Sequence, residues 1–361
     1  MKKELSGTAS GKTAFVADGK RVTLKSLATH LGLSISTISR GLKGAPDIGA
    51  DTIALIRKAA EEVGYTPDLR GVKLRTGQTF TLVYLKAIHP HQDVPDGAVV
   101  AQIDAITSFL QNTPYQLQII PWNPAQDDPL AILTRIVSGR LADGVLLDMT
   151  QPQDKRVLYL LENGFPFVTF GRTELFTEHP YVDANSEQAA YDAARYLLAR
   201  GHRRIAITGA QQAYTFNMQR KRGYLRALAE AGVVADPALI REDGLSARNA
   251  REVVTSMLGA VNPPTGFICV NESSALGVMS GIRDCGQQVG VDCDVIARAS
   301  TAMCDYLNPP LATCYLHIQQ VAQVFCDYLL RSIAGEPAAG LQTVFDCEFR
   351  VPAAVAGLAQ Y

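Results

Sequence analysis

The sequence lacks several patterns that assign a chain to a class at first sight. It has no run of about 18 apolar residues, the length that a membrane-spanning helix needs. Its first residues, MKKELSGTASGKT, lack the apolar core of a signal peptide, so we expect a cytoplasmic protein without a membrane partner. The seven cysteines all lie from Cys269 onward and form no CxxC pair. An odd number in this arrangement argues against a disulfide framework and against a zinc ribbon.

Motifs for nucleotide, metal or covalent chemistry are also missing. No GxGxxG follows a strand-like run, so nothing indicates a dinucleotide. The segment GTASGKT is similar to a phosphate-binding loop, but Gly7 lies one residue too close to Gly11 and no strand precedes it. There is no nucleophile elbow and no His and Cys cluster with metal-ligand spacing. We therefore expect no enzyme activity, no cofactor and no metal site.

The chain does have an uneven distribution of charge. Residues 1–80 carry 13 Lys and Arg against 7 Asp and Glu, a net charge of +6. Residues 81–361 carry 21 against 28, a net charge of -7. A small basic part on a larger acidic part favours a nucleic-acid module joined to another domain, and a solvated basic terminus is the alternative. The length of 361 residues allows two or three domains.

Three short helical patterns follow a polar tail over residues 1–20, which we expect to be flexible. Thr23 is a suitable N-cap for the first helix, and Gly32 would end it with a tight turn. Ser34 can cap the second helix, and a third is predicted over about Thr52–Val63. A helix, a tight turn and a second helix within about 20 residues form the helix-turn-helix unit.

The second of these helices, within the sequence LSISTISRGLKG, carries hydroxyl side chains and an arginine where Glu, Lys and Gln are usual. In a helix-turn-helix this helix enters the major groove of DNA, and its first residues reach the base edges. An apolar side chain such as Ile35 can meet a thymine methyl group, and Arg40 can reach a guanine or a phosphate. The alternative is a set of caps on a solvated face, and Ser34 as an N-cap fits it.

The hydrophobic pattern of the sequence changes after a polar linker. From Phe80, strand-like runs such as TLVYL, GVLLDM, RIAITG and GFICV alternate with helical stretches. Such alternation predicts an α/β fold with parallel sheets that are flanked by helices. About 280 residues would hold two such sheets.

The segments VTLKSLATHLGLSISTISRGLKG and YTPDLRGVKLRTG resemble the lac-repressor (LacI/GalR) family of bacterial transcription regulators. The likeness extends through VDANSEQA, RGHRRIA and RxxGY to the family's effector domain, which has the two lobes of periplasmic sugar-binding proteins. It implies a helix-turn-helix domain over residues 21–68, a hinge over 69–79 and an effector-binding and dimerisation domain over 80–361. We place the first lobe at about 80–173 and 303–333, and the second at about 174–302 and 334–361.

For the DNA-binding part the resemblance implies a homodimer on a pseudo-palindromic operator. It also implies that the hinge becomes a helix on DNA, where Leu74 would act as a minor-groove wedge. An exposed linker leucine is the alternative for Leu74. The residues that we predict to contact DNA are Thr23, Ser34, Ile35, Ser36, Thr37, Ser39, Arg40, Lys43 and Leu74.

Gly71 stands where the family hinge has alanine, and a helical glycine costs roughly 1 kcal/mol relative to alanine. Replacement of Gly71 by alanine should therefore tighten operator binding, because less free energy is spent on folding the hinge. A titration of labelled operator measures this. Equal or weaker binding by the variant would contradict a hinge that folds on DNA.

For the effector domain the resemblance implies a small ligand, a sugar or sugar derivative, between the lobes. Arg220 falls on the arginine of the RxxG motif, and Glu272 takes the position of an acidic residue that accepts hydrogen bonds from sugar hydroxyls. Tyr214 and Phe216 are predicted to line the cleft, with ordinary core packing as the equal alternative. His89 and His91 could bind an acidic ligand or a metal, but solvated loop histidines are the preferred interpretation.

The family segment VVGFDD is replaced here by Val295–Ser300, VIARAS. Both aspartates are absent, and Arg298 stands where an aromatic is common, which is compatible with a ligand other than a plain neutral sugar. The sequence thus predicts a transcription regulator, a repressor, that is controlled by a small molecule. A solute-binding protein with the same body and no regulatory role is the alternative.

Overall fold

The computed structural model describes residues 22–65, 77–88, 94, 96–210, 214–243 and 245–353. The chain divides between Gln78 and Thr79 into two compact units, an N-terminal head and a larger body. The predicted tail over 1–20 and most of the predicted hinge, with Gly71 and Leu74, lie outside the described residues.

The head consists of three helices: α1 (Leu24–Leu31), α2 (Ile35–Leu42) and α3 (Ala50–Glu62). Thr23 caps α1 in a reciprocal capping box with Ser26, and Gly32 ends the helix at φ 65°. Leu27, Ile38 and Ile56, one from each helix, form a fully buried centre. The third helix starts two residues earlier than predicted, after Gly49, which provides no side-chain cap.

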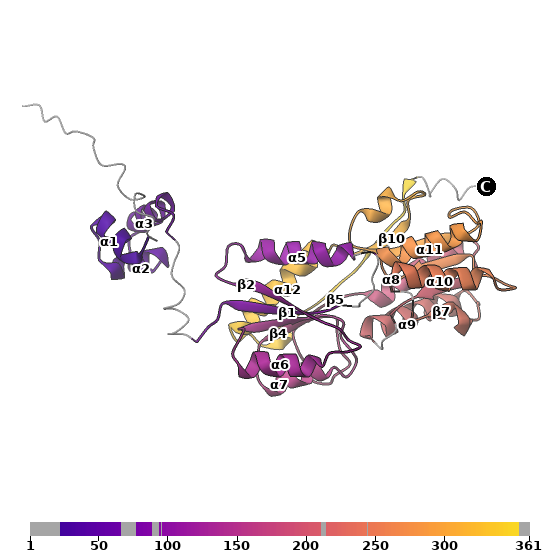
Figure 1. Ribbon diagram of the computed structural model, residues 1–361, viewed down its shortest axis with the longest axis horizontal. Coiled ribbons are helices and arrows are strands. Elements are labelled where there is room, and N and C mark those ends of the chain that lie inside the picture. The colour runs from indigo at the N-terminus through magenta and orange to yellow at the C-terminus, as the bar shows by residue number, and fades with distance from the viewer. Residues whose placement is uncertain are drawn as a thin grey trace, which may run out of the picture. The chain divides into compact units, whose positions relative to one another are not determined.

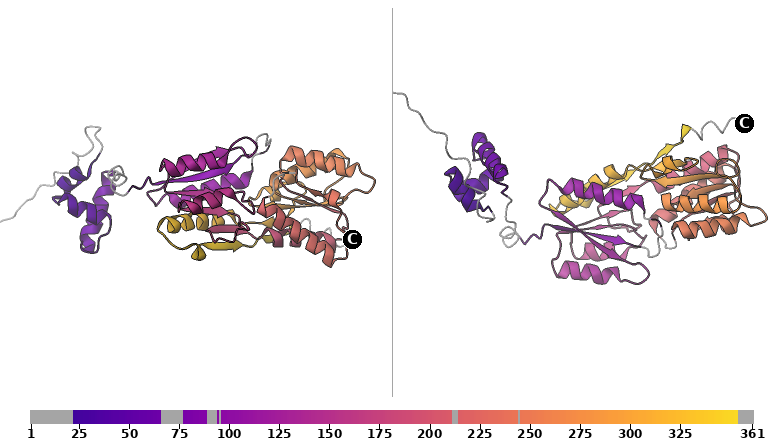
Figure 2. Two further views of the ribbon diagram at one scale, coloured as in Figure 1. Left: turned by 90° about the horizontal axis from the view of Figure 1, so that it is seen from below. Right: turned by 45° about the horizontal axis from the view of Figure 1, so that its top comes forward.

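The body holds two six-stranded sheets, one for each lobe (Figures 1 and 2). The first has the order β11-β5-β4-β3-β1-β2 and is entirely parallel. Its strands are β1 (Thr81–Ala87), β2 (Gln116–Trp122), β3 (Gly144–Leu147), β4 (Phe167–Phe170), β5 (Tyr181–Ala184) and β11 (Gln342–Phe345). Helices α5 (Gly97–Leu110) and α12 (Ile318–Ile333) cover one face, and α6 (Pro129–Ser138) and α7 (Lys155–Glu162) cover the other (Figure 1).

The second sheet has the order β12-β10-β9-β8-β6-β7, with only β12 antiparallel to its neighbour. Its strands are β6 (Ile205–Thr208), β7 (Ile240–Arg241), β8 (Gly266–Cys269), β9 (Asp294–Ala299), β10 (Ala312–Tyr315) and β12 (Glu348–Arg350). The covering helices are α8 (Ser186–Ala199) and α9 (Thr215–Glu230) on one face, and α10 (Ala247–Leu258) and α11 (Glu272–Asp284) on the other. Three short 3-10 helices complete the described elements: Pro237–Leu239, Met303–Tyr306 and Ala338–Gly340.

The chain passes between the lobes three times: from β5 to α8, from β10 to α12, and from β11 to β12. These crossings correct the lobe boundaries that we expected from the sequence. Strands β5 and β11 were assigned to the second lobe, but they pair with each other in the first sheet. Residues 303–315 were assigned to the first lobe, but Cys304 and Leu311 pack in the core of the second. Hydrophobic periodicity identifies a strand without indicating which sheet it joins.

Helices α8 and α9 pack so closely that one position tolerates only glycine. A Cβ atom on Gly223 would overlap the carbonyl oxygen of Glu187 on α8. Gly223→Ala should therefore lower the free energy of unfolding of the body by about 3 kcal/mol, because two backbones must separate. Thermal or denaturant unfolding measures the loss. The matched control is Gly259→Ala, where the nearest atom lies 3.6 Å from the added Cβ. Equal stability of the two variants would contradict this packing.

Candidate functional site

The outer face of α2 carries the cluster of hydroxyl groups predicted from the sequence. The Ser34 hydroxyl accepts a hydrogen bond from the backbone N–H of Thr37, 3.1 Å away, so Ser34 is the N-cap. The same oxygen lies 3.1 Å from the Ser36 hydroxyl and 2.8 Å from the Thr37 hydroxyl. Ile35 beside them is 47% exposed, so an apolar side chain on this face is available to a partner.

The basic residues of this face lie near the end of α2. Arg40 is exposed and forms an ion pair with Asp47, in the turn before α3. Lys43, the C-cap of α2, is exposed as well. The sequence did not indicate the Arg40–Asp47 pair, because it depends on how the turn folds back. Such an exposed pair contributes little to stability, so Arg40 can exchange Asp47 for another anion at small cost.

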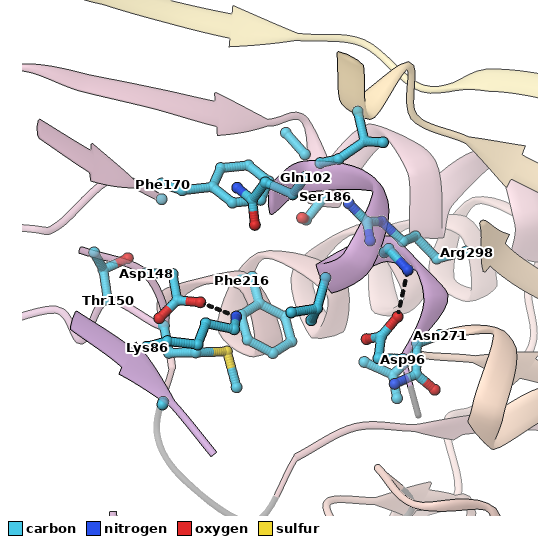
Figure 3. A pocket seen from close by; sticks show the side chains of 18 of the residues that line it. Lys86, Asp96, Gln102, Asp148, Thr150, Phe170, Ser186, Phe216, Asn271 and Arg298 are labelled. Carbon is cyan, nitrogen blue, oxygen red and sulfur yellow. Dashed lines mark hydrogen bonds and ion pairs between the residues drawn. The ribbon is translucent and has the colours of Figure 1, made fainter. Parts of the chain in front are cut away.

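The body contains a cavity of about 430 Å³ between its lobes. Its walls come mainly from the carboxyl ends of strands, with Lys86 on β1, Asp148 after β3 and Phe170 on β4 (Figure 3). Asp183 on β5 lines it as well. Asn271 follows β8 on the opposite side. In open α/β sheets this is the edge at which ligands bind.

A polar network lines the first-lobe side of the cavity. Lys86 forms an ion pair with Asp148 (Figure 3). The buried Tyr84 hydroxyl lies 3.0 Å from both Gln102 Oε1 and Asp148 Oδ2. Burial, with the charge of Asp148, raises the pKa of Tyr84 well above its usual value. Two buried polar atoms of the network, Gln102 Nε2 and Asp148 Oδ1, have no hydrogen-bond partner among the described residues.

Two arginines line the second-lobe side. Arg220, on α9, is 5% exposed and donates a hydrogen bond from Nη2 to the Thr208 carbonyl oxygen, 3.1 Å away. Burial is the main reason why the pKa of Arg220 falls to about 10, and the charge of Arg298 lowers it further. Arg298, near the end of β9, extends toward Ser186 at the start of α8 (Figure 3).

The four residues predicted for the effector site are thus only partly brought together. Phe216 and Arg220 line the cavity, whereas Tyr214 and Glu272 do not. Tyr214 is 1% exposed and stacks on Phe216, with ring centroids 5.7 Å apart. It therefore positions an aromatic wall from behind, in line with the core-packing alternative.

Glu272 is the clearest departure from the predicted site. Its Oε1 accepts hydrogen bonds from the backbone N–H groups of Ser300 and Thr301, at 3.2 and 2.9 Å, and from the Thr301 hydroxyl at 2.8 Å. It is 2% exposed. The glutamate thus holds the loop after β9, the segment from which both family aspartates are absent. The preceding residue, Asn271, lines the cavity instead.

Several cavity residues were missed by the sequence analysis: Lys86, Gln102, Asp148, Phe170 and Asp183. Four of them lie at or just after the end of a strand, a position that could have identified them. Gln102 lies within α5 and carries no such signal. His89 and His91 fall outside the described residues. Within the described ranges, no group of three or more His, Cys, Asp or Glu could hold a metal ion, and no helix is long and apolar enough to cross a membrane.

A helix-turn-helix head joined to a two-lobed body with a cavity at the strand ends defines a class of DNA-binding transcription regulators. Residues 194–351 match the family model described as periplasmic binding protein-like domain. The chain is 32% identical over 280 residues to the HTH-type transcriptional regulator AglR of Rhizobium meliloti, covering 77% of each protein. It is 24% identical over 326 residues to the repressor CytR of Escherichia coli, covering 90% of this chain and 94% of CytR.

Solved structures agree with this fold. The lac repressor dimer bound to operator and the anti-inducer ONPF has a TM-score of 0.73 at 21% identity, covering 92% of this chain and 98% of that one. The regulator CelR in complex with cellobiose has a TM-score of 0.68 at 21% identity, covering 92% and 99%. The chain belongs to the LacI family of helix-turn-helix transcription regulators. The family and the α/β fold predicted from the sequence are confirmed.

Proposed function

We propose that this regulator binds a pseudo-palindromic operator as a homodimer and represses transcription from it. The residues that would contact DNA are those predicted from the sequence, with the hydroxyls of α2, Ile35 and Arg40 at the centre. The observation that carries this proposal is the exposed face of α2, where an apolar side chain lies among hydroxyl groups beside an exposed arginine whose ion-pair partner is exposed as well. These groups suit thymine methyls, base edges and phosphates.

We also propose that a small ligand in the cavity changes the affinity for the operator. A donor at Gln102 Nε2 and an acceptor at Asp148 Oδ1 lie within one network and lack partners among the described residues. A hydroxyl group both donates and accepts, so a hydroxyl-rich ligand would satisfy both. The Phe170 and Phe216 rings on the cavity wall suit a sugar ring (Figure 3). The cytoplasm, where such a regulator meets its DNA, is the expected location.

Selection of duplexes from a random library by the full chain tests the DNA-binding proposal. We expect enrichment of one pseudo-palindrome, whose binding weakens steeply as salt rises. A solute-binding protein without a regulatory role would enrich no sequence. An asymmetric selected site would contradict the homodimer.

A further inference from the structure

The charged side chains that line the cavity differ in whether they have partners. Its three carboxylates all have partners: Asp148 pairs with Lys86, Asp183 pairs with Arg172, and Asp96 accepts a hydrogen bond from the Ala98 N–H at 3.0 Å. The remaining charged groups in the lining are two guanidinium groups. Neither guanidinium group is paired with one of these carboxylates, although Asp96, whose partner is a backbone N–H, also keeps its negative charge in the cavity.

Neither guanidinium has an acidic partner within the described residues. The hydrogen bond of Arg220 goes to the Thr208 carbonyl, and no carboxylate lies within ion-pair distance of it. Among the described residues, Arg298 has no hydrogen-bond partner and no ion-pair partner. Arg220 on α9 and Arg298 on β9 both come from second-lobe elements, and both line the cavity. A nearly buried arginine without an anion is costly, so the site gains from binding one.

We propose that the natural effector is an acidic, hydroxyl-rich molecule whose anionic group binds between Arg220 and Arg298. This inference rests on the proposed effector site. The planar fork of each arginine matches a carboxylate or phosphate. The start of α8 at Ser186 adds the positive end of a 14-residue helix on the same wall (Figure 3). The hydroxyl end would reach Gln102 and Asp148, so one ligand would bridge the two lobes.

The first test uses simple anions, so that it does not depend on knowing the effector. The full chain is heated in 10 mM inorganic phosphate, in acetate or in chloride at constant ionic strength. For an anion with a dissociation constant of about 1 mM, we expect a Tm about 3 °C higher than in chloride. Arg298→Gln should remove that rise, and the exposed Arg283→Gln on α11 should keep it. Arg298→Met serves as a second variant if Arg298→Gln folds poorly.

The second test uses calorimetry to compare two matched series of sugars. The first is glucose, glucuronate and glucose 6-phosphate, and the second is galactose, galacturonate and galactose 6-phosphate. We expect the acid of the preferred series to bind at least 10-fold more tightly than its neutral parent. Arg298→Gln should abolish that preference, because the loss of affinity should be much larger for the acid than for the neutral sugar. Tighter binding of glucuronate than of the phosphate identifies a carboxylate ligand, and the reverse order identifies a phosphate.

Equal anion responses in wild type and Arg298→Gln would overturn the proposal. A neutral sugar that shifts operator affinity equally in both proteins would overturn it as well, while the regulatory function would stand. If anions bind at Arg298 but no bound compound alters operator affinity, the anion subsite is supported, and the proposal that a ligand controls operator binding is contradicted.

Discussion

Arg40→Ala is expected to weaken binding to the selected operator by at least about 100-fold and to change non-specific binding only slightly. A bidentate contact from arginine to guanine contributes about 1–3 kcal/mol of discrimination, and a dimer loses two such contacts. Stability should change little, because Arg40 is exposed and its pair with Asp47 is a surface pair. Titrations of operator and of scrambled duplex at one salt concentration measure the two losses.

Two controls isolate the base contact from other effects. Asp47→Asn removes the same ion pair but leaves the arginine, so it should bind the operator at least as tightly as wild type. Lys58→Ala removes an exposed charge from α3 and should preserve the ratio of specific to non-specific affinity. If Arg40→Ala lowers the affinity for operator and for scrambled DNA by the same factor, Arg40 contacts only phosphates.

Arg220→Met is expected to abolish the response to the effector while operator binding without ligand stays unchanged. Loss of a charged hydrogen bond to a ligand costs about 2–5 kcal/mol, so ligand affinity should fall by a factor of about 30 or more. The body should stay folded, because the buried side chain has no acidic partner among the described residues. Its removal leaves only the Thr208 carbonyl oxygen without a hydrogen bond that it had before. Calorimetry with the tightest compound of the panel and an operator titration measure both effects.

The matched control is Arg222→Met, two residues along α9. Arg222 is exposed and pairs with Glu174 and Glu187 outside the cavity. We expect it to retain both ligand affinity and operator release. An unchanged effector response in Arg220→Met would remove this arginine from the ligand site.

The head could be predicted well because its signals are local. The cap at Thr23, the turn at Gly32 and the buried Ile38 each follow from a few adjacent residues. The alternation of strands and helices in the body is a local signal of the same kind. The pair between Arg40 and Asp47 could not be predicted, because it depends on the shape of a turn.

The cavity was harder to predict because its parts are far apart in the chain. Lys86 meets Asp148 across 62 positions, and no local pattern joins them. Glu272 was predicted to contact a ligand, whereas in the structure its carboxylate accepts hydrogen bonds from the backbone of Ser300 and Thr301. The family pattern located the residue correctly, but only the geometry shows which way its carboxylate turns.

The most direct test of ligand control measures both affinities of the full chain. Operator affinity is determined with and without the tightest compound of the panel, and affinity for that compound is determined with and without operator. Thermodynamic linkage requires the two ratios to be equal, and we expect a factor of about 5–150. A ratio below one for the operator identifies an inducer, and a ratio above one a corepressor. A ratio of one in both titrations would contradict a regulator controlled through this cavity.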